Sequence, residues 1–415
     1  MRICYPILSL ALAASAAQAE MTTKTISVDS QNRTYLVYTP ASVSKTDTTP
    51  LILFMHPNGM TASQFATAFN IQSVSDMTKS IALVPEALDE QDSDIKSLYN
   101  NIQTMGISTP GLSITNVWGA GVSVSTSVIT SKLGNMSSLF SMMYPNLAKS
   151  GKIQFNKSVN DVNFVNAIIN ETENSYKIDT SKVFMIGASM GGAMTYKYAY
   201  DSSSKIKGAA VICGFIGAEV DTIGKSLNIP ICIFHSQADS IVYYKGGTFS
   251  GSIPETVASI AARNGCGNYT ETDVPNIADD TLSIKRYDYA CDTTRRVRFF
   301  SIDNATHQKF LVSDYKTGPN DIDYYQEVYK FLFGEQNAGS VEETMADANM
   351  IYPNPVKEIL HTTRSGFYSI VNAKGQSIKS GWVDNGNIDL STLAKGSYVF
   401  LLKNENGYFS AKFIK

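Results

Sequence analysis

Ser189 lies at the centre of the pentapeptide Gly187-Ala188-Ser189-Met190-Gly191. An apolar run at residues 182–186 precedes the pentapeptide, and a helix-like stretch at residues 193–200 follows it. A serine between two glycines at a strand-to-helix turn is the pattern of a nucleophile elbow, because the glycines let strand and helix pass closely while the hydroxyl projects above the sheet edge. The spacing therefore predicts that Ser189 is a nucleophile for acyl transfer.

A serine nucleophile needs a base, and in this kind of turn the partners follow in the order Ser, Asp, His. The chain has four histidines. His56 and His235 each end an apolar run, which is typical of strand ends, and His361 lies beyond an expected linker. His307 lies in a polar loop after the strand-like residues 296–302. We therefore predict His307 as the base. The alternative is that His307 is an ordinary histidine of a surface loop with no catalytic role.

An acid is needed to orient the imidazole of the base. Residues 231–234 form an apolar run that leads into a loop carrying Asp239, which suits this role. Asp201 and Asp221 are the alternatives, but Asp201 follows the expected nucleophile helix among serines and is typical of a solvated helix end. The sequence favours Asp239.

Acyl transfer passes through an oxyanion that two backbone N–H groups stabilise, one of them from the residue after the nucleophile. That residue is Met190. The second donor is expected in the loop after the strand that ends at His56, where Pro57 has no N–H to offer. We therefore predict Met190 and Asn58 as the oxyanion donors.

Four further segments carry a family resemblance: Arg33-Thr34-Tyr35-Leu36-Val37-Tyr38-Thr39-Pro40, His56-Pro57-Asn58-Gly59, residues 230–247 with His235, Asp239, Val242, Tyr244, Gly246 and Gly247, and residues 255–266 ending in Ala261-Ala262-Arg263-Asn264-Gly265-Cys266. They resemble secreted esterases related to polyhydroxybutyrate depolymerases and to feruloyl and acetylxylan esterases. The resemblance spans roughly residues 24–333. It departs from that group at Pro57, where the group usually has glycine, and at residues 304–309, where the group has a glycine-rich, often Trp-Pro-containing loop.

The coarse pattern of the same region predicts an α/β-hydrolase fold. Apolar strand candidates alternate with helix-like stretches, which indicates a mainly parallel sheet with helices on both faces. The strand candidates are residues 50–55, 80–84, 183–186, 208–213 and 229–234, and the helix candidates are 62–77, 161–173 and 193–200. Residues 25–28 and 33–38 are expected to form an antiparallel edge hairpin.

The N-terminus and the overall charge indicate export. Residues 1–19 combine Arg2, an apolar stretch and Ala17-Gln18-Ala19, which is the pattern of a cleaved signal peptide. The net charge of −3 is too small, and the basic residues too scattered, for nucleic-acid binding. No cluster has the spacing of metal ligands, so we expect neither a metal nor a cofactor.

Cysteine usage fits an exported protein. Removal of Cys4 with the signal peptide leaves four cysteines. Cys266 follows the expected helix 253–264 and Cys291 ends the strand-like residues 282–290, and export favours a disulfide between them. Cys213 and Cys232 border buried strand-like runs, where we expect free core cysteines.

One stretch, residues 106–156, breaks the alternation of strands and helices. It is rich in serine, methionine and glycine and contains Trp118. Long insertions of this kind are often lids or substrate walls, although surface decoration is the alternative. Trp118 is accordingly a candidate for stacking on substrate, with a core aromatic as the other interpretation.

A second domain is expected after a helix at residues 322–333. Residues 334–348 are polar and acidic and indicate a linker, and residues 349–415 show short alternating strands with Lys374-Gly375, Asn385-Gly386 and Asn406-Gly407 turns. These features predict a small β-sandwich. The motifs Tyr352-Pro353-Asn354-Pro355, Ile388-Asp389-Leu390-Ser391, Lys395-Gly396-Ser397-Tyr398 and Lys412-Phe413-Ile414-Lys415 resemble the C-terminal sorting domain of type IX secretion cargo. A carbohydrate-binding module is the alternative, but Trp382 is the one tryptophan in this segment.

Together these features predict a secreted serine hydrolase of carboxylic esters, with residues 20–333 as its catalytic domain. The resemblance implies feruloyl or acetyl esters on plant cell-wall polysaccharide as substrates, polyesters such as polyhydroxyalkanoate being the second possibility. A serine peptidase of the same fold and a non-catalytic surface binding protein remain as alternatives. The expected partners are the ester substrate and, through the C-terminal domain, the outer-membrane secretion machinery.

Overall fold

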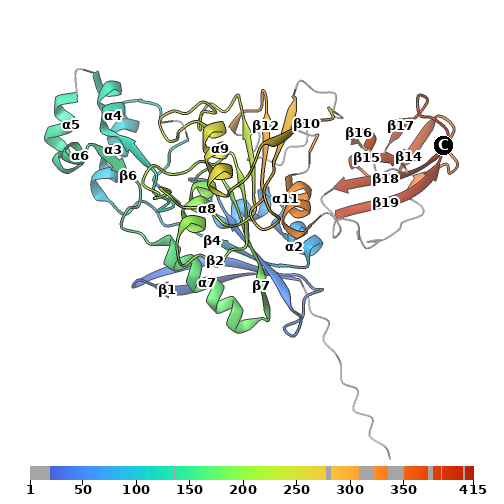
Figure 1. Ribbon diagram of the computed structural model, residues 1–415, viewed down its shortest axis with the longest axis horizontal. Coiled ribbons are helices and arrows are strands. Elements are labelled where there is room, and N and C mark those ends of the chain that lie inside the picture. Colours follow the sequence, from blue (N-terminus) through green and yellow to red (C-terminus); the bar gives the residue numbers. More distant parts are fainter. Residues whose placement is uncertain are drawn as a thin grey trace, which may run out of the picture.

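The computed structural model describes residues 19–109, 111–134, 137–276, 282–307, 321–322, 324–334, 350–372, 377–384, 386–404 and 407–415 (Figure 1). The expected signal peptide and the expected linker lie outside the described residues, apart from residues 19 and 334 at their ends. Among the described residues, no helix combines the length and the apolar character that a membrane crossing requires.

A ten-stranded sheet forms the larger domain, in the order β1-β2-β4-β3-β7-β8-β9-β12-β11-β10. The six strands from β4 to β12 in that order run parallel, and antiparallel pairs complete both edges. The predicted parallel sheet and the edge hairpin are thus confirmed. The strands are β1 Glu20–Val28, β2 Gln31–Thr39, β3 Thr49–Met55, β4 Ile81–Pro85, β7 Ile178–Ala188, β8 Gly208–Ile212, β9 Ile231–Ser236, β10 Tyr269–Val274, β11 Ile284–Tyr289 and β12 Val297–Ile302.

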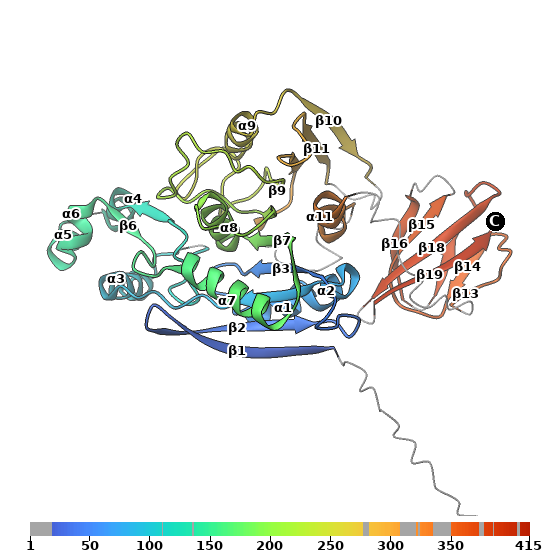
Figure 2. The ribbon, with the colours of Figure 1, turned by 60° about the horizontal axis from the view of Figure 1, so that its bottom comes forward.

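Helices cover both faces of this sheet, because alternate side chains of its strands enter two different cores. Leu51, Leu53 and Met55 of β3 belong to one core, whereas Ile52 and Phe54 belong to the other. Residues of α7 Asp161–Ser175, α8 Met190–Tyr200 and α9 Ile253–Arg263 fill the first core. Residues of α1 Ala62–Ala68, α2 Ile71–Thr78 and α11 Tyr324–Phe333 fill the second, so that α8 and α11 flank the sheet from opposite sides (Figure 2).

The helix expected at residues 62–77 is two helices. Asn70 separates α1 from α2 and has a φ of 45°. A continuous α-helix does not allow this left-handed conformation, and Asn is one of the few residues that adopt it at low cost. The apolar periodicity continues across the break, which is why the sequence favoured a single helix.

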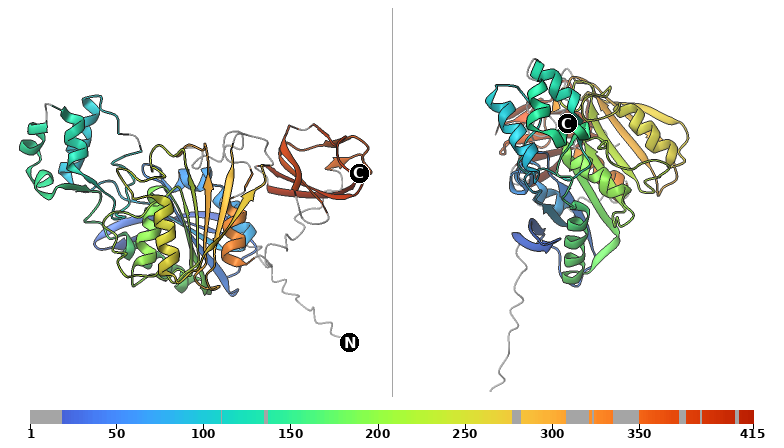
Figure 3. Two further views of the ribbon diagram at one scale, coloured as in Figure 1. Left: turned by 45° about the horizontal axis from the view of Figure 1, so that its top comes forward. Right: turned by 90° about the vertical axis from the view of Figure 1, so that its left-hand side faces the viewer.

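The insertion forms a small subdomain after α3 Ser93–Thr104. It contains β5 Ser123–Ser125, α4 Thr126–Leu133, α5 Ser137–Met143, α6 Pro145–Ser150 and β6 Lys152–Gln154, with β5 and β6 paired antiparallel. These helices, drawn in teal, project from one end of the main sheet (Figure 3). The base of the insertion is tied to the rest of the domain by Asn156, whose amide donates 3.2 Å to the Leu88 carbonyl.

The C-terminal domain is an all-β sandwich, as predicted. A three-stranded sheet, β13-β14-β17, and a four-stranded sheet, β16-β15-β18-β19, share one core that contains Leu360, Ile370, Phe400 and Phe413. The strands are β13 Ile351–Tyr352, β14 Ile359–Thr362, β15 Gly366–Asn372, β16 Ser377–Val383, β17 Asn387–Asp389, β18 Ser397–Asn404 and β19 Gly407–Ile414.

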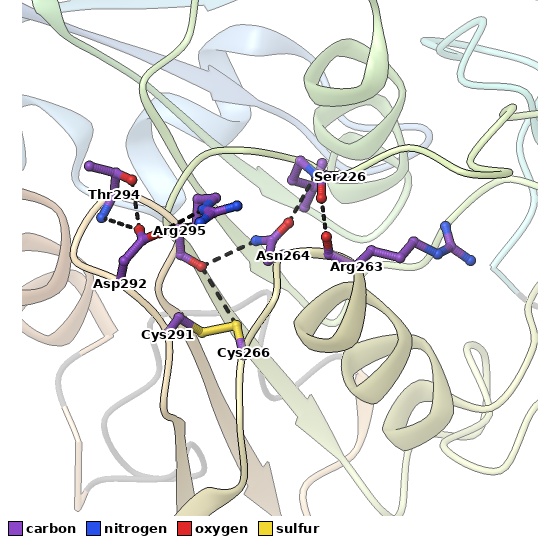
Figure 4. Close-up of a disulfide and its surroundings, with 9 residues drawn as sticks. Ser226, Arg263, Asn264, Cys266, Cys291, Asp292, Thr294 and Arg295 are labelled. Carbon is purple, nitrogen blue, oxygen red and sulfur yellow. Dashed lines mark hydrogen bonds and ion pairs between the residues drawn. A yellow bond between two sulfur atoms is a disulfide. The ribbon is translucent and has the colours of Figure 1, made fainter.

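A disulfide joins Cys266 to Cys291, confirming the predicted pair (Figure 4). Cys266 lies just after α9 and Cys291 just after β11, so the bridge fastens the end of the helix to the end of β11. Beside it, the Asn264 amide donates 3.2 Å to the Arg295 carbonyl (Figure 4). Cys213 and Cys232 are free and buried, as expected.

Candidate active site

The turn between β7 and α8 has the geometry of a nucleophile elbow. Ser189 has a φ of 53°, a left-handed conformation that is costly for a non-glycine residue. The two glycines of the pentapeptide lack the room for a side chain: a Cβ at Gly187 would clash with the Gly191 carbonyl, and one at Gly191 would clash with the Met55 carbonyl. The glycines therefore let α8 pass against β7 and against the end of β3.

His307 and Asp239 meet Ser189 at this turn. The Ser189 hydroxyl donates 2.9 Å to Nε2 of His307, and Nδ1–H of His307 donates 2.7 Å to Oδ2 of Asp239. The three side chains are buried, with Ser189 the most exposed at 9 %. The structure thus brings together the predicted nucleophile, base and acid in the order of a catalytic triad.

The loop after β9 holds the Asp239 carboxylate in place. Oδ1 accepts hydrogen bonds from the N–H groups of Ile241 and Val242, at 2.9 and 2.8 Å, which leaves Oδ2 for His307. The two alternative acids lie elsewhere. Asp201 caps the end of α8 and accepts hydrogen bonds from Ser203, and Asp221 forms an ion pair with Lys225.

The loop that carries His307 follows β12 and is fastened at its start. The Asp303 carboxylate accepts hydrogen bonds from the N–H and the hydroxyl of Ser283, at 2.8 and 2.7 Å. Asn304 then turns the chain with a φ of 55°, and the buried Ala305 anchors the loop in the core. These contacts direct the imidazole of His307 back toward Ser189.

The electrostatics of the pair suit a base that carries a proton during the reaction. Burial raises the pKa of Asp239, but the hydrogen bond and the positive charge of His307 outweigh burial and hold this pKa below 3.8. Burial lowers the pKa of His307, whereas the nearby Cys213 sulfur and the Asp239 carboxylate raise it, and the net pKa lies above 6.5. Asp239 is therefore ionised, and its carboxylate is placed where it can stabilise an imidazolium at His307.

The loop at residues 56–59 lies against the elbow, because Gly191 packs directly on the Met55 and His56 carbonyls. His56 is fully buried, its Nδ1–H donates 2.7 Å to the Pro57 carbonyl, and its Nε2 accepts from the Ala87 N–H at 3.0 Å. Burial lowers the pKa of His56 to about 4, so its ring is neutral. His56 thus shapes the loop, with both of its ring nitrogens bound to backbone groups.

Both predicted oxyanion donors border this contact. Met190 is the first residue of α8, a position whose N–H has no acceptor within the helix. Asn58 is held in the 56–59 loop by its own side chain, which exchanges two hydrogen bonds with the backbone of Ser113. The N-terminus of α8 and the 56–59 loop therefore meet beside Ser189.

The prediction that Trp118 stacks on substrate is wrong. Its side chain is fully buried, its ring packs on that of His56 at 4.7 Å between centroids, and its Nε1–H donates 2.8 Å to the His56 carbonyl. A tryptophan with no exposed face cannot stack on a ligand. Trp118 is instead a core aromatic that supports the 56–59 loop.

A groove of about 620 Å³ opens beside Asn58. Residues 57–60 and residues of α1 line it, and none of them is ionisable. The lining residues are Pro57, Asn58, Gly59, Met60, Ser63, Gln64, Thr67 and Ala68. Of the site residues predicted from the sequence, Asn58 is the one that lines this groove.

The comparison with protein families matches two segments of the chain. Residues 134–257, which include Ser189 and Asp239, match the phospholipase/carboxylesterase family. Together with the parallel sheet and the elbow, this match decides the fold of the larger domain. It is an α/β hydrolase. Residues 350–415, which form the β-sandwich, match the secretion system C-terminal sorting domain.

The α/β hydrolase is also similar to solved structures, at low identity. An acetyl xylan esterase from Aspergillus awamori is 13 % identical with a TM-score of 0.43, over 75 % of this chain and 99 % of that one. A ferulic acid esterase from Anaeromyces mucronatus is 12 % identical with a TM-score of 0.39, over 77 % and 90 %. An S-formylglutathione hydrolase from Agrobacterium tumefaciens is 12 % identical with a TM-score of 0.42, over 78 % and 96 %. At these values the likenesses say nothing about the substrate. No curated protein matches the chain.

Sequence reasoning missed the residues that hold the 56–59 loop. Ser113 pairs with Asn58, and the Asn116 carbonyl accepts from the Gly59 N–H at 3.4 Å. Both contacts use the backbone of the insertion, which leaves no signal in residue type. The sequence offered one clue to these contacts, the indole N–H of Trp118, because a buried tryptophan usually donates this group to an acceptor.

Proposed function

We propose that this protein is a secreted serine hydrolase of carboxylic esters, with Ser189 as nucleophile, His307 as base and Asp239 as orienting acid. The observation that carries the proposal is the continuous chain of hydrogen bonds from Asp239 through His307 to Ser189. The carboxylesterase match of residues 134–257 supports the same conclusion.

In the first step the Ser189 oxygen attacks the ester carbonyl as its proton passes to Nε2 of His307. A bond forms between this oxygen and the carbonyl carbon, and the carbonyl electrons move onto its oxygen. The N–H groups of Met190 and Asn58 would stabilise that oxyanion. The intermediate collapses, the bond to the alcohol oxygen breaks, and His307 gives its proton to the departing alcohol.

In the second step water replaces the alcohol. His307 takes a proton from the water, whose oxygen attacks the acyl carbon, and the bond to Ser189 breaks as the proton returns to the serine. Asp239 stays ionised throughout, accepts the Nδ1–H of His307 and fixes its tautomer. The products are a carboxylic acid and an alcohol.

We further propose feruloyl or acetyl esters of plant cell-wall polysaccharide as the substrates. Three features support this choice: the resemblance of residues 33–40, 56–59, 230–247 and 255–266 to such esterases, the uncharged groove beside Asn58, and the sorting domain. An exported enzyme meets polymers that cannot enter the cell. Uncharged acyl and sugar groups need no charged side chain in the groove that binds them.

The two domains would have separate roles in an exported enzyme. We propose that residues 20–333 carry the chemistry and that residues 349–415 deliver the enzyme to the outer-membrane secretion machinery, with residues 334–348 as linker. The sorting-domain match of residues 350–415 supports this delivery role. The enzyme would then act outside the cell or on its surface.

The triad is tested with p-nitrophenyl acetate and a fluorophosphonate label. Ser189→Ala and His307→Ala should each lower turnover by several orders of magnitude, and the double variant should lose little more, because the two residues act as a unit. Mass spectrometry should find the label on Ser189 of the wild-type protein. Full turnover in either single variant, or a label elsewhere, would refute the assignment.

The substrate is tested with feruloylated arabinoxylan, acetylxylan, short-chain polyhydroxyalkanoate and a peptide panel. We expect release of ferulate or acetate by the wild-type enzyme and none by Ser189→Ala. Clearing of polyhydroxyalkanoate granules with no action on xylan esters would make the protein a polyester depolymerase. Cleavage of peptides alone would make it a peptidase.

A further inference from the structure

His235 is a second buried histidine beside the triad, and the mechanism above does not use it. It lies near the end of β9, four residues before Asp239, and its side chain has no solvent exposure. Its Nε2 lies 2.8 Å from the Val242 carbonyl and 3.6 Å from Oδ2 of Asp239. His235 therefore reaches across the loop that delivers the acid.

The contacts of His235 fix its tautomer. A carbonyl oxygen can only accept, so Nε2 carries the proton that is donated to Val242. Nδ1 is buried and has no hydrogen-bond partner among the described residues, which fits a ring nitrogen without a proton. Burial lowers the pKa of His235 to about 4, against the opposing effects of Asp239 and Val242, with His307 lowering it slightly further. The ring is thus a neutral donor at the pH where the triad works.

Val242 connects His235 to the acid. Its carbonyl accepts from His235, and its N–H donates 2.8 Å to Oδ1 of Asp239. Val242 is itself buried, so the peptide groups on either side of it have few other positions. A shift of this residue would rotate the Asp239 carboxylate and lengthen the 2.7 Å bond between Oδ2 and His307.

We propose that His235 is a positioning residue of the triad, whose neutral imidazole closes the loop from residue 235 to residue 242 and holds Asp239 on His307. The inference rests on the proposed function, since it assigns a role within the same site. His235 touches neither the reacting serine nor the oxyanion donors, and it acts only through Val242 and Asp239.

Two amide replacements separate the donor from the rest of the side chain. In His235→Gln the amide nitrogen can occupy the place of Nε2 and still donate to Val242. In His235→Asn the amide is too short and reaches only the place of Nδ1. His235→Phe keeps an aromatic ring, somewhat larger than the imidazole, and removes both nitrogens. His235→Gln should therefore keep the hydrogen bond to Val242, whereas His235→Asn and His235→Phe should lose it.

The first readout is turnover of p-nitrophenyl acetate per fluorophosphonate-labelled site. A misplacement of about 1 Å in a catalytic group can cost about a hundredfold. We expect His235→Asn and His235→Phe to lose between tenfold and about a hundredfold in kcat with KM nearly unchanged, and His235→Gln to stay within about threefold of the wild type.

The second readout is the pH profile of kcat/KM, which a merely structural role would not move. A looser contact with Asp239 lowers the pKa of His307, so the rising limb should shift to lower pH in His235→Phe and His235→Asn and return in His235→Gln. Asp239 and His307 are the ionisable groups that shift the pKa of His235. The pH profiles of the variants report on both groups, because a change at either one alters the rate.

The proposal is overturned if the labelled fraction of His235→Phe has the kcat and pH profile of the wild type, or if the glutamine and asparagine variants turn over equally. NMR of histidine-labelled wild-type protein gives a test that needs no variant: an Nδ1–H tautomer, or a ring that titrates together with His307, would also overturn it. A wild-type protein that the label does not mark at Ser189 would instead refute the proposed function.

Discussion

The side-chain amide of Asn58 pairs with both backbone groups of Ser113. Its Oδ1 accepts from the Ser113 N–H at 2.6 Å, and its Nδ2 donates to the Ser113 carbonyl at 3.3 Å. These two hydrogen bonds resemble those between neighbouring β-strands, and they join the 56–59 loop to the start of the insertion. The proposed oxyanion donor is therefore held by its own side chain, directly after Pro57, which has no N–H to offer.

Asn58→Ala should keep the backbone N–H of residue 58 but release it from Ser113. Loss of an oxyanion donor costs about a hundredfold to a thousandfold in kcat, and a loosened donor should cost about tenfold or more, with KM nearly unchanged. Steady-state kinetics on p-nitrophenyl acetate checks this. Ser113→Ala is the matched control, because it keeps both backbone partners, and it should behave as wild type. Equal effects of the two substitutions would contradict the role of the pairing.

Gly191→Ala should disrupt the elbow. A Cβ at this position would clash with the Met55 carbonyl, and backbone cannot move aside as a side chain can. Overpacking of this kind costs at least about 1–3 kcal/mol of folding free energy. Urea unfolding and activity both measure the effect. Gly251→Ala is the control, since a Cβ there meets no atom within 4 Å, and a similar loss in both variants would show that the clash is not the cause.

The pH dependence of kcat/KM should follow the neutral form of His307, because only that form accepts the proton of Ser189. The rate should rise with pH through the pKa of His307, and this pKa lies above 6.5. Asp239→Asn removes the charge and the acceptor that help to raise it, so the rise should move to lower pH while kcat falls by several orders of magnitude. Asp201→Asn, which alters a helix cap, should leave the profile in place. An unmoved profile in Asp239→Asn would contradict the pairing with His307.

Replacement of Cys266 and Cys291 by serine should lower the free energy of unfolding by about 3 kcal/mol in the chain-entropy model, since the bridge closes a loop with a sequence separation of 25. Both cysteines lie away from the triad, so activity at room temperature should persist. Urea unfolding with and without a reductant measures the difference. The reductant should lower the stability of the wild type and leave the double variant unchanged. Two alkylatable thiols at these positions in unreduced protein would refute the bridge.

A chain that ends at Gly334 should keep its kcat and KM on a small soluble ester. The C-terminal domain has its own core, and the triad and the 56–59 loop lie in the larger domain. In the producing cell, the same truncation should leave the enzyme inside. Kinetics and cell fractionation read the two outcomes separately. Normal export together with lost binding to insoluble polysaccharide would favour a carbohydrate-binding role for residues 350–415.

The triad could be placed from the sequence because each of its residues follows a recognisable strand. Ser189, Asp239 and His307 come after apolar runs that became β7, β9 and β12, and the carboxyl ends of parallel strands meet at one edge of a sheet. The roles of the three residues, and of Met190 and Asn58, remain predictions. The structure adds their contacts, which no pattern in the sequence gives.

Three features that the sequence did not predict have separate physical causes. β10 is exposed along nearly all of its length, so it shows none of the alternation that identifies a half-buried strand. Trp118 lies in a polar, glycine-rich stretch. Only the structure shows that its side chain is buried and that its indole N–H donates to the distant His56 carbonyl. The break at Asn70 depends on a left-handed backbone that the apolar pattern across it does not record.

The exposed edge of β10 also has a consequence for the protein in concentrated solution. An unpaired edge strand is a template on which another molecule can add its own strand. Glu271 and Asp273 of β10 lie beside Lys285 of β11 and form ion pairs with it. Two molecules that met edge to edge in antiparallel register would bring these carboxylates against one another and strip them of water. We therefore expect the charges on this strand to disfavour growth of the sheet from one molecule into the next at the β10 edge.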